Sequence, residues 1–326
     1  MVKYIRCPDG TGRMDMLYFI VNPNAGGVNG YRIWKRLERR LVRKKTEYQV
    51  VLTGGRGEAR LIAAELTENA AGSGEEIILA GVGGDGTMNE IVDGVHISEN
   101  LILGYIPVGG WSDLARGLHL PRRPGACLDR ILSSGEVRKI DYGVLDYGDD
   151  APMHRRFLVS AGCGFEAGFT ELLRIQHEEG RLSGIPVVRG AAEKAAYLNC
   201  LLNMKTVRGS LILDEARRIE LNHIFLMSAL IQPTENGRRL APGSSSADGL
   251  LAVSVLHNAS RLRQIGALTA SGFRITPNDA GVRMYSCREV KVILEEAMPL
   301  HADGETCGMQ SEFIMRCVKQ KLNIIC

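Results

Sequence analysis

The feature that most constrains the fold is the run Gly81-Val82-Gly83-Gly84-Asp85-Gly86-Thr87-Met88-Asn89-Glu90. It follows an apolar run at residues 77–80 and precedes a helical pattern that begins near Ile91. A strand, a glycine-rich turn and a helix start place several backbone N–H groups and the positive end of a helix dipole around one point. Such a turn suits phosphate oxygens, because glycine lets the backbone approach a ligand closely. Asp85 within the run indicates that a cation or a sugar hydroxyl binds there as well.

The same glycines also fit the dinucleotide-binding pattern G-x-G-x-x-G, which is weak evidence by itself. That interpretation requires an acidic residue about 20 positions later, at the end of the next strand. The next strand, residues 101–106, is followed by Pro107 and Gly109, and the first acid after it is Asp113. The P-loop signature G-x-x-x-x-G-K-[ST] is absent. A plain strand-to-helix turn without a ligand remains open at this point.

Composition limits the class of protein. The chain has 326 residues, enough for two domains, and a net charge of +3 that is too small to imply nucleic-acid binding. Its eight cysteines form no C-x-x-C pair, which favours free thiols in a reducing compartment. No apolar run is long enough for a transmembrane segment. We therefore expect a cytoplasmic protein whose membrane contact, on the inner face, is peripheral.

The first 140 residues alternate between strand and helix patterns, which favours a parallel sheet with right-handed crossovers. Loops that contain glycine or small polar residues follow the strands and would line one rim of the sheet, where open α/β sheets bind ligands. The predicted strands are residues 16–21, 48–52, 77–80 and 101–106.

Residues 31–45 form an amphipathic helix pattern. Ile33, Trp34, Leu37 and Leu41 share one face, and eight lysines and arginines cover the rest. The basic residues are either an ordinary solvated surface or a patch drawn to anionic lipid head groups. The sequence leaves both readings open.

Many short strands follow residue 137, and they predict an antiparallel sandwich or barrel. Helical patterns are limited to residues 169–175, 191–202 and 260–271, and residues 176–188 are expected to form a loop or lid. The predicted strands are residues 137–145, 156–161, 209–214, 217–221, 223–231, 250–256, 282–295, 311–318 and 322–325.

Several motifs occur in a fixed order and together resemble the catalytic family of diacylglycerol kinases, particularly the bacterial soluble lipid kinases. Sphingosine kinases are relatives, and NAD kinases are more distant ones that share G-G-D-G-T. The resemblance runs from about residue 16 to the C-terminus. Its motifs are residues 22–27, Thr53 with Gly57 and Ala59, residues 83–90, residues 107–116, Asp248-Gly249-Leu250-Leu251 and Asp303-Gly304-Glu305.

The resemblance implies an NAD-kinase-like fold: an N-terminal α/β domain with a parallel sheet, which holds ATP, and a C-terminal β-rich sandwich domain, which holds the lipid. The chemistry would take place in the cleft between them. The expected boundaries are 1–140 and 141–310, with 311–326 returning to the first domain. The nucleotide-binding residues implied are Asn22, Thr53, Gly83, Gly84, Asp85, Gly86, Thr87, Met88, Asn89 and Gly110.

The catalytic residues implied are Glu305, as the general base for the lipid hydroxyl, and Asp85. Ser245, Asp248 and the Leu250 carbonyl match a structural Mg²⁺ site, and Asp113 is a further candidate ligand, since Mg²⁺ needs only one or two carboxylates besides water and phosphate. Without the resemblance, a hairpin turn with no chemistry remains open for Asp303-Gly304-Glu305, and a simple turn remains open for Asp248-Gly249.

One motif departs from the family. Where the family has P-x-G-T-x-N-D, this chain has Gly110 in place of threonine and Ser112 in place of asparagine. A lost hydroxyl donor costs about 0.5–1.5 kcal/mol, so nucleotide binding is expected to be weakened rather than abolished. Trp111 is either a stacking surface for adenine or a packing residue.

The sequence therefore predicts an ATP- and Mg²⁺-dependent transferase of phospholipid biosynthesis, a kinase acting on a hydroxyl of diacylglycerol or a related lipid at a membrane surface. The alternatives are an NAD kinase-like enzyme and a nucleotide- or lipid-binding module with lost or weakened turnover. No nucleic-acid partner is expected. The acceptor lipid and the oligomeric state, including a homodimer, stay open.

Overall fold

The computed structural model describes residues 16–71, 76–109, 112–133, 135–148, 151–178, 186–237, 239–260, 262–264, 266 and 281–326. The chain divides into two compact units. The first unit comprises the residues up to Tyr142 together with Ser246–Asp248 and Val318–Cys326. The second unit comprises Gly143–Ser245 and Gly249–Cys317. Both ends of the sequence therefore contribute to the first unit.

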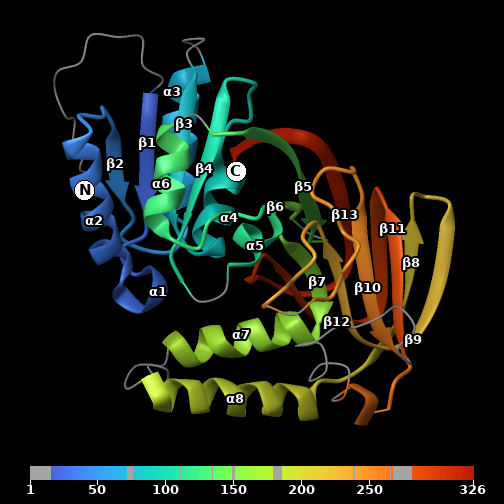
Figure 1. Ribbon diagram of the computed structural model, residues 1–326. Helices are drawn as coiled ribbons and strands as arrows, with labels where there is room; N and C mark the ends of the chain where they lie inside the picture. Colours follow the sequence, from blue (N-terminus) through green and yellow to red (C-terminus); the bar gives the residue numbers. More distant parts are fainter. Residues whose placement is uncertain are drawn as a thin grey trace. The chain divides into compact units, whose positions relative to one another are not determined.

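The first unit contains a sheet with the strand order β2, β1, β3, β4 and the end of β13 (Figure 1). Each neighbouring pair is parallel, with partners such as Phe19 and Val50, Tyr18 and Leu79, and Ile324 and Leu103. Continuous apolar runs form these strands because both faces of the sheet are covered. The strands are β1 (Met16–Val21), β2 (Gln49–Leu52), β3 (Ile77–Gly83), β4 (Leu101–Pro107) and β13 (Glu305–Ile325).

Helices cover this sheet. α2 and α6 pack on the same face, where Trp34 contacts Phe19 with ring centroids 5.0 Å apart. The sequence did not indicate α6, which is short and follows an arginine-rich turn. The helices of the first unit are α1 (Ala25–Val28), α2 (Gly30–Arg43), α3 (Glu58–Ala71), α4 (Asp85–Gly94), α5 (Asp113–Gly117) and α6 (Pro124–Leu132).

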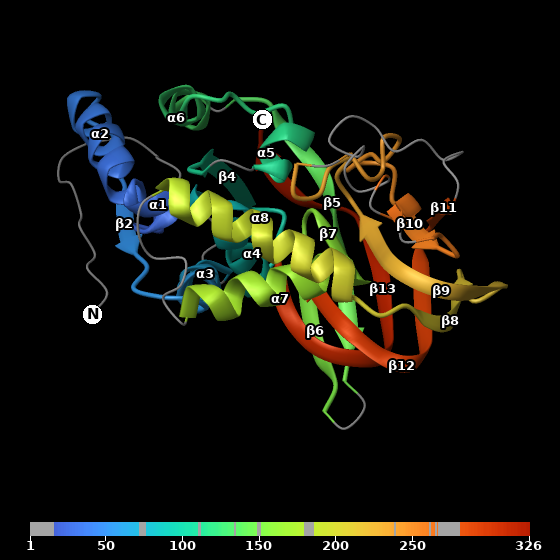
Figure 2. The same ribbon diagram turned by 90° about the horizontal axis from the view of Figure 1, so that it is seen from below.

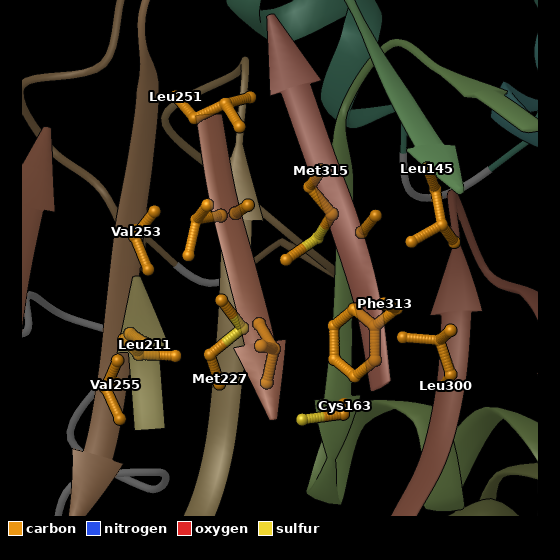
Figure 3. Packing of buried hydrophobic residues seen from close by; sticks show 14 of the residues in the cluster. Leu145, Cys163, Leu211, Met227, Leu251, Val253, Val255, Leu300, Phe313 and Met315 are labelled. Atoms are coloured by element: carbon orange, nitrogen blue, oxygen red, sulfur yellow. The ribbon is translucent and has the colours of Figure 1, made fainter. Parts of the chain in front are cut away.

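The second unit is built from antiparallel strand pairs, in agreement with the predicted β-rich domain. Figure 3 shows its core, in which Phe313 and Met315 of β13 pack among aliphatic side chains from neighbouring strands. β5 and β13 each run across the boundary between the units. The strands are β5 (Val137–Tyr147), β6 (Met153–Phe157), β7 (Ser160–Gly164), β8 (Val207–Leu213), β9 (Arg217–Leu230), β10 (Leu251–His257), β11 (Val282–Cys287) and β12 (Glu289–Ala302), with β13 as above.

Two long helices also belong to the second unit: α7 (Phe165–Glu178) and α8 (Pro186–Asn203). They lie side by side (Figures 1 and 2), and Phe165 and Phe169 of α7 both pack edge-on against Tyr197 of α8. The predicted loop at residues 176–188 is wrong at its ends, which are helical, and 179–185 lie outside the described residues. Most of the predicted helix at 260–271 also lies outside them.

Several predicted strand boundaries are wrong because side chains replace backbone partners. The strand expected at 156–161 is interrupted where the N–H groups of Leu158 and Val159 bind the Asp303 carboxylate. The strand expected at 282–295 divides into β11 and β12 where the N–H groups of Arg288 and Glu289 bind Asp214. Elsewhere predicted neighbours fuse, so that 217–221 joins 223–231 in β9 and 311–318 joins 322–325 in β13.

Candidate functional site

The glycine-rich turn joins β3 to α4 in the first unit. Gly84 caps α4 without a side-chain hydrogen bond, so the first N–H groups of the helix have no intrahelical acceptor. Gly83 must be glycine, because a Cβ there would lie 2.5 Å from Oγ1 of Thr87, whereas a Cβ on Gly86 would meet nothing within 4 Å. The helix terminus is therefore open beside Gly86 and is suited to an anion.

Asn22 links the ends of two neighbouring strands at this turn. Its backbone N–H donates to the Val82 carbonyl at 2.9 Å, and its Nδ2 donates to Oγ1 of Thr87 at 3.1 Å. Its Oδ1 accepts the N–H of Asn24 at 3.0 Å. The structure therefore brings together Asn22 and Thr87, which belong to two separate motifs.

Asp85 fixes the loop that follows β4. Its Oδ1 accepts the hydroxyl of Tyr105 at 2.9 Å and its Oδ2 accepts the N–H of Asp113 at 2.7 Å. Burial, followed by the charge of Asp85, raises the pKa of Tyr105 well above its usual range, so the phenol remains a donor. Asp85 is thus partly a structural anchor, a role that its motif did not predict.

A cavity of about 630 Å³ lies next to Asp113 and α5. Its wall includes Pro107, Gly109 and Ser112 from the predicted nucleotide loop, together with Arg116, His119 and Arg122. The cavity is therefore polar and basic, which suits phosphate groups. Asp113 itself is only 4 % exposed, and its Oδ1 lies 4.0 Å from the guanidinium of Arg116. Gly110 and Trp111 lie outside the described residues.

Three predicted nucleotide contacts are buried. Met88 is 0 % exposed and its N–H donates to the Gly84 carbonyl, so neither group is available to a ligand, and its assignment as a contact is corrected. Asn89 and Thr53 are also buried, and the Thr53 N–H binds the Val21 carbonyl at 2.9 Å. Met88 and Asn89 lie in α4 and Thr53 directly follows β2, and all three side chains are buried inside the protein.

Glu90 has a role that the sequence did not indicate. Its carboxylate accepts the N–H of Gly57 at 2.9 Å and the N–H of Ala59 at 3.2 Å. These donors lie at the start of α3, where helix N–H groups lack partners and a negative charge is favourable. Glu90 thereby fixes the loop at residues 53–57. Its place at the end of the glycine-rich run was the available signal.

In the second unit, Asp303-Gly304-Glu305 joins β12 to β13 as a tight hairpin. Asp303 and Gly304 have φ of 47° and 79°, which are values of a left-handed turn. The Asp303 carboxylate accepts three N–H groups, those of Leu158, Val159 and Ser160, at 2.6–2.8 Å. Glu305 follows the turn, partly exposed, with Oε2 3.9 Å from the guanidinium of Arg155. The hairpin interpretation and a catalytic role for Glu305 are therefore compatible.

A buried polar network supports this turn. Glu235 and His301 are each 2 % exposed, and Nε2 of His301 lies 3.1 Å from Oε1 of Glu235, which also accepts the Ser160 hydroxyl at 2.7 Å. Nδ1 of His301 lies 3.3 Å from the backbone nitrogen of Gly304. Burial opposes charge on both partners, but their mutual hydrogen bond and attraction raise the pKa of His301 and lower that of Glu235.

The predicted metal ligands Ser245, Asp248 and Leu250 lie where the chain passes between the two units. Ser245 and Leu250 belong to the second unit and Asp248 to the first. Ser245 and Asp248 are exposed, and Gly249, between Asp248 and Leu250, has a φ of 79°. Within the described ranges no three His, Cys, Asp or Glu side chains form a group that could hold a metal ion. The Asp113 N–H links Asp113 to the Asp85 carboxylate.

The chain matches two known domain families. Residues 16–145 match the family described as "Diacylglycerol kinase catalytic domain", and residues 188–326 match "YegS C-terminal NAD kinase beta sandwich-like domain". A relative from Chromohalobacter salexigens, named "Probable lipid kinase YegS-like", is 31 % identical over 247 residues, which are 74 % of this chain and 73 % of the relative. The chain therefore belongs to the diacylglycerol kinase catalytic-domain family of lipid kinases.

Solved structures support the two-domain fold. A crystal structure of a diacylglycerol kinase from Bacillus anthracis covers 97 % of this chain and 98 % of its own, with a TM-score of 0.69 and 16 % identity. A crystal structure of an NAD kinase from Archaeoglobus fulgidus in complex with ATP covers 95 % of this chain and 94 % of its own, with a TM-score of 0.52 and 17 % identity. The NAD-kinase-like fold with a C-terminal β sandwich, expected from the sequence, is confirmed.

Proposed function

We propose that this protein is an ATP-dependent lipid kinase of phospholipid biosynthesis that transfers the γ-phosphate of ATP to a hydroxyl of diacylglycerol or a related lipid. The observation that carries the proposal is the open N-terminus of α4 beside Gly86, in a chain of the lipid kinase family. None of the described helices is long and apolar enough to cross a membrane. We place the reaction at the cytoplasmic surface of a membrane, where the lipid is found.

The first unit would bind the nucleotide. The N–H groups at the start of α4 and the basic side chains Arg116 and Arg122 of the neighbouring cavity would hold the phosphates. Asn22 and Thr87 would support the turn from the β1 side. Phosphoryl transfer depends mainly on positioning and charge neutralisation, which these groups supply.

The second unit would bind the acceptor. Glu305 would take the proton from the lipid hydroxyl as that oxygen forms its bond to the γ-phosphorus, while the bond from this phosphorus to the bridging oxygen of ADP breaks. A base needs to approach the hydroxyl to within about 2.6–3.2 Å. The Asp303 and His301 contacts hold the turn before Glu305 in one conformation, which favours such precision.

Mg²⁺ is the expected metal, and the oxygen donors of the chain fit it in kind. Asp248 is exposed, and the oxygens of Ser245 and Leu250 flank it in sequence, while Asp85 supplies a carboxylate at the start of α4. Ser245, Asp248 and Leu250 would hold a structural ion, with Asp85 and Asp113 facing the ATP-bound ion. When bound, Mg²⁺ neutralises charge on the phosphates.

The test is a transfer assay with radiolabelled ATP and a panel of acceptors: diacylglycerol, sphingosine, phosphatidylglycerol and NAD, with Mg²⁺ present. Transfer to a lipid and not to NAD is expected. Transfer to NAD alone would replace the proposal with an NAD kinase. Thermal stabilisation by MgATP without transfer to any acceptor would make the protein a binding module, the outcome that Gly110 and Ser112 would explain.

A further inference from the structure

Helix α2 carries a row of arginines opposite its buried face. Trp34, Leu37 and Leu41 are buried against the sheet. Four arginines of this helix are exposed, and they are here named the arginine stripe: Arg32, Arg36, Arg39 and Arg43. At about 100° per residue the four lie within about 60° of one another, directly opposite the buried residues, and the stripe is about 16 Å long. It is therefore one continuous line of positive charge.

The stripe is not neutralised by the protein. Among the described residues, no acidic side chain pairs with Arg32, Arg36, Arg39 or Arg43, and the one contact of the Arg43 side chain is to the Arg39 carbonyl at 3.4 Å. The other cations of the same helix are used internally. Lys35 pairs with Glu38 at 2.6 Å, while Arg40 and Lys44 pair with Asp129 of α6 at 2.7 and 3.3 Å.

Asp129 pairs with Arg40 and Lys44 but not with the arginine stripe. Slight burial opposes its charge, but hydrogen bonds from Lys44 and Arg40 outweigh this and lower the pKa of its carboxyl. Asp129 thus anchors one side of α2 to α6 and leaves the opposite side free. Figure 1 shows α2 and α6 together on the same face of the β1–β4 sheet.

The charge of the whole chain is concentrated in this segment. Residues 31–45 contain eight of the 40 lysines and arginines and one of the 37 acidic residues, so the remainder of the chain is net negative. The overall charge of +3 conceals this asymmetry. A local excess of this size creates a field that attracts anionic surfaces while the rest of the molecule is repelled.

We propose that the arginine stripe docks this protein on an anionic lipid surface. Each cation that reaches such a surface increases the partition coefficient by about five-fold. Tyr31 and Val42, beside the stripe, are 47 % and 53 % exposed, and these side chains suit the boundary between head groups and acyl chains. This mixture of arginine with exposed apolar side chains favours a lipid surface over nucleic acid. Docking itself does not depend on the proposed kinase activity, but it would bring such an enzyme to its substrate.

The experiment measures sedimentation of the full-length protein with sucrose-loaded vesicles of phosphatidylcholine alone or with about 30 % phosphatidylglycerol. The variant Arg36→Glu/Arg39→Glu/Arg43→Glu should lower the partition coefficient on the anionic vesicles by at least about 30-fold. The control variant Arg208→Glu/Lys319→Glu/Lys321→Glu changes the net charge equally at exposed positions elsewhere, and should lower it by less than about three-fold. Circular dichroism melting confirms that both variants fold.

The proposal is overturned if the stripe variant and the control bind alike, if neutral vesicles bind the wild-type protein as well as anionic ones, or if it binds single-stranded DNA and no vesicle. Phosphate transfer is assayed in parallel on dioctanoylglycerol dispersed without vesicles, where the stripe variant should match the wild type. Vesicle binding without transfer to any lipid would refute the proposed function and leave the docking surface established.

Discussion

Asp85 in the first unit and Asp303 in the second perform the same task in different surroundings. Asp85 accepts the N–H of Asp113 and Asp303 accepts three backbone N–H groups, so that each carboxylate fixes a loop beside a candidate reactive group. Asp85 lies at an open helix terminus and receives support from Tyr105 and Asp113. The turn at Asp303 is supported in addition by a buried hydrogen-bond network, formed by Ser160, Glu235 and His301.

The difference indicates which unit tolerates movement. The open terminus of α4 can adjust to a ligand, because its first N–H groups have no acceptor within the helix. The hairpin before Glu305 cannot move without breaking a buried ion pair, which would leave an uncompensated charge in the interior. Substitutions near Glu305 should therefore affect chemistry or stability sharply, and those near Asp85 more gradually.

The largest effect is expected from Glu305→Gln. Loss of the proposed base should lower kcat for lipid phosphorylation by about 10²–10⁴-fold with little change in the melting temperature. The matched control is Glu312→Gln, also on β13, whose side chain pairs with Lys291 at 2.7 Å. Steady-state kinetics on diacylglycerol measures both. A Glu305→Gln enzyme that retains the wild-type kcat would contradict the assignment of the base.

His301→Leu should give the largest loss of stability. It leaves Glu235 buried without its cationic partner, which costs about 3–5 kcal/mol. Chemical denaturation near pH 6 measures this loss. The double variant Glu235→Gln/His301→Leu removes the charge as well and should recover part of the stability. If the single and double variants have the same unfolding free energy, the buried charge of Glu235 is not the cause of the lost stability.

The same pair predicts a pH dependence. The pKa of His301 is raised, so its contribution is fully present below its unfolded value of 6.5 and is lost as pH rises through the folded value. The pKa of Glu235 is lowered, so its contribution is present above its unfolded value of 4.5 and is lost as pH falls through the folded value. The unfolding free energy of the wild type should therefore decline from pH 6 towards alkaline pH more than that of the double variant. Parallel curves would contradict this linkage.

Asp85→Ala should have an intermediate effect. It removes the charged acceptor of the Tyr105 hydroxyl and of the Asp113 N–H, with an expected loss of about 2–3 kcal/mol in unfolding free energy. Tyr105→Phe is the matched control, because it removes one donor and keeps the carboxylate. Thermal denaturation and the KM for ATP are measured together. A KM for ATP that rises in Asp85→Ala and not in Tyr105→Phe would assign Asp85 to the nucleotide rather than to the fold alone.

The sequence predicted the first unit better than the second for a physical reason. The turn at Gly83–Asp85 is local, and its motif predicted a strand, a turn and a helix in that order, although α4 begins at Asp85, ahead of the pattern expected near Ile91. The network behind Glu305 joins residues 160, 235 and 301, which no local pattern connects. Strand limits in the second unit failed for the same reason, since Asp214 and Asp303 terminate strands remote from them in sequence.

The smallest effect is expected from Glu90→Gln, which tests whether the open terminus of α4 depends on the neighbouring loop. Glutamine keeps one carbonyl acceptor for the N–H groups of Gly57 and Ala59 but loses the charge that favours the start of α3, so the unfolding free energy should fall by about 1 kcal/mol. Glu76→Gln, an exposed acid just before β3, is the control and should change stability by less than about 0.5 kcal/mol. Hydrogen exchange of the Gly57 and Ala59 amides gives the local readout, because faster exchange there, with β3 unchanged, identifies loosening of this loop alone. Unchanged exchange at both amides would show that the backbone of α3, and not Glu90, fixes the loop.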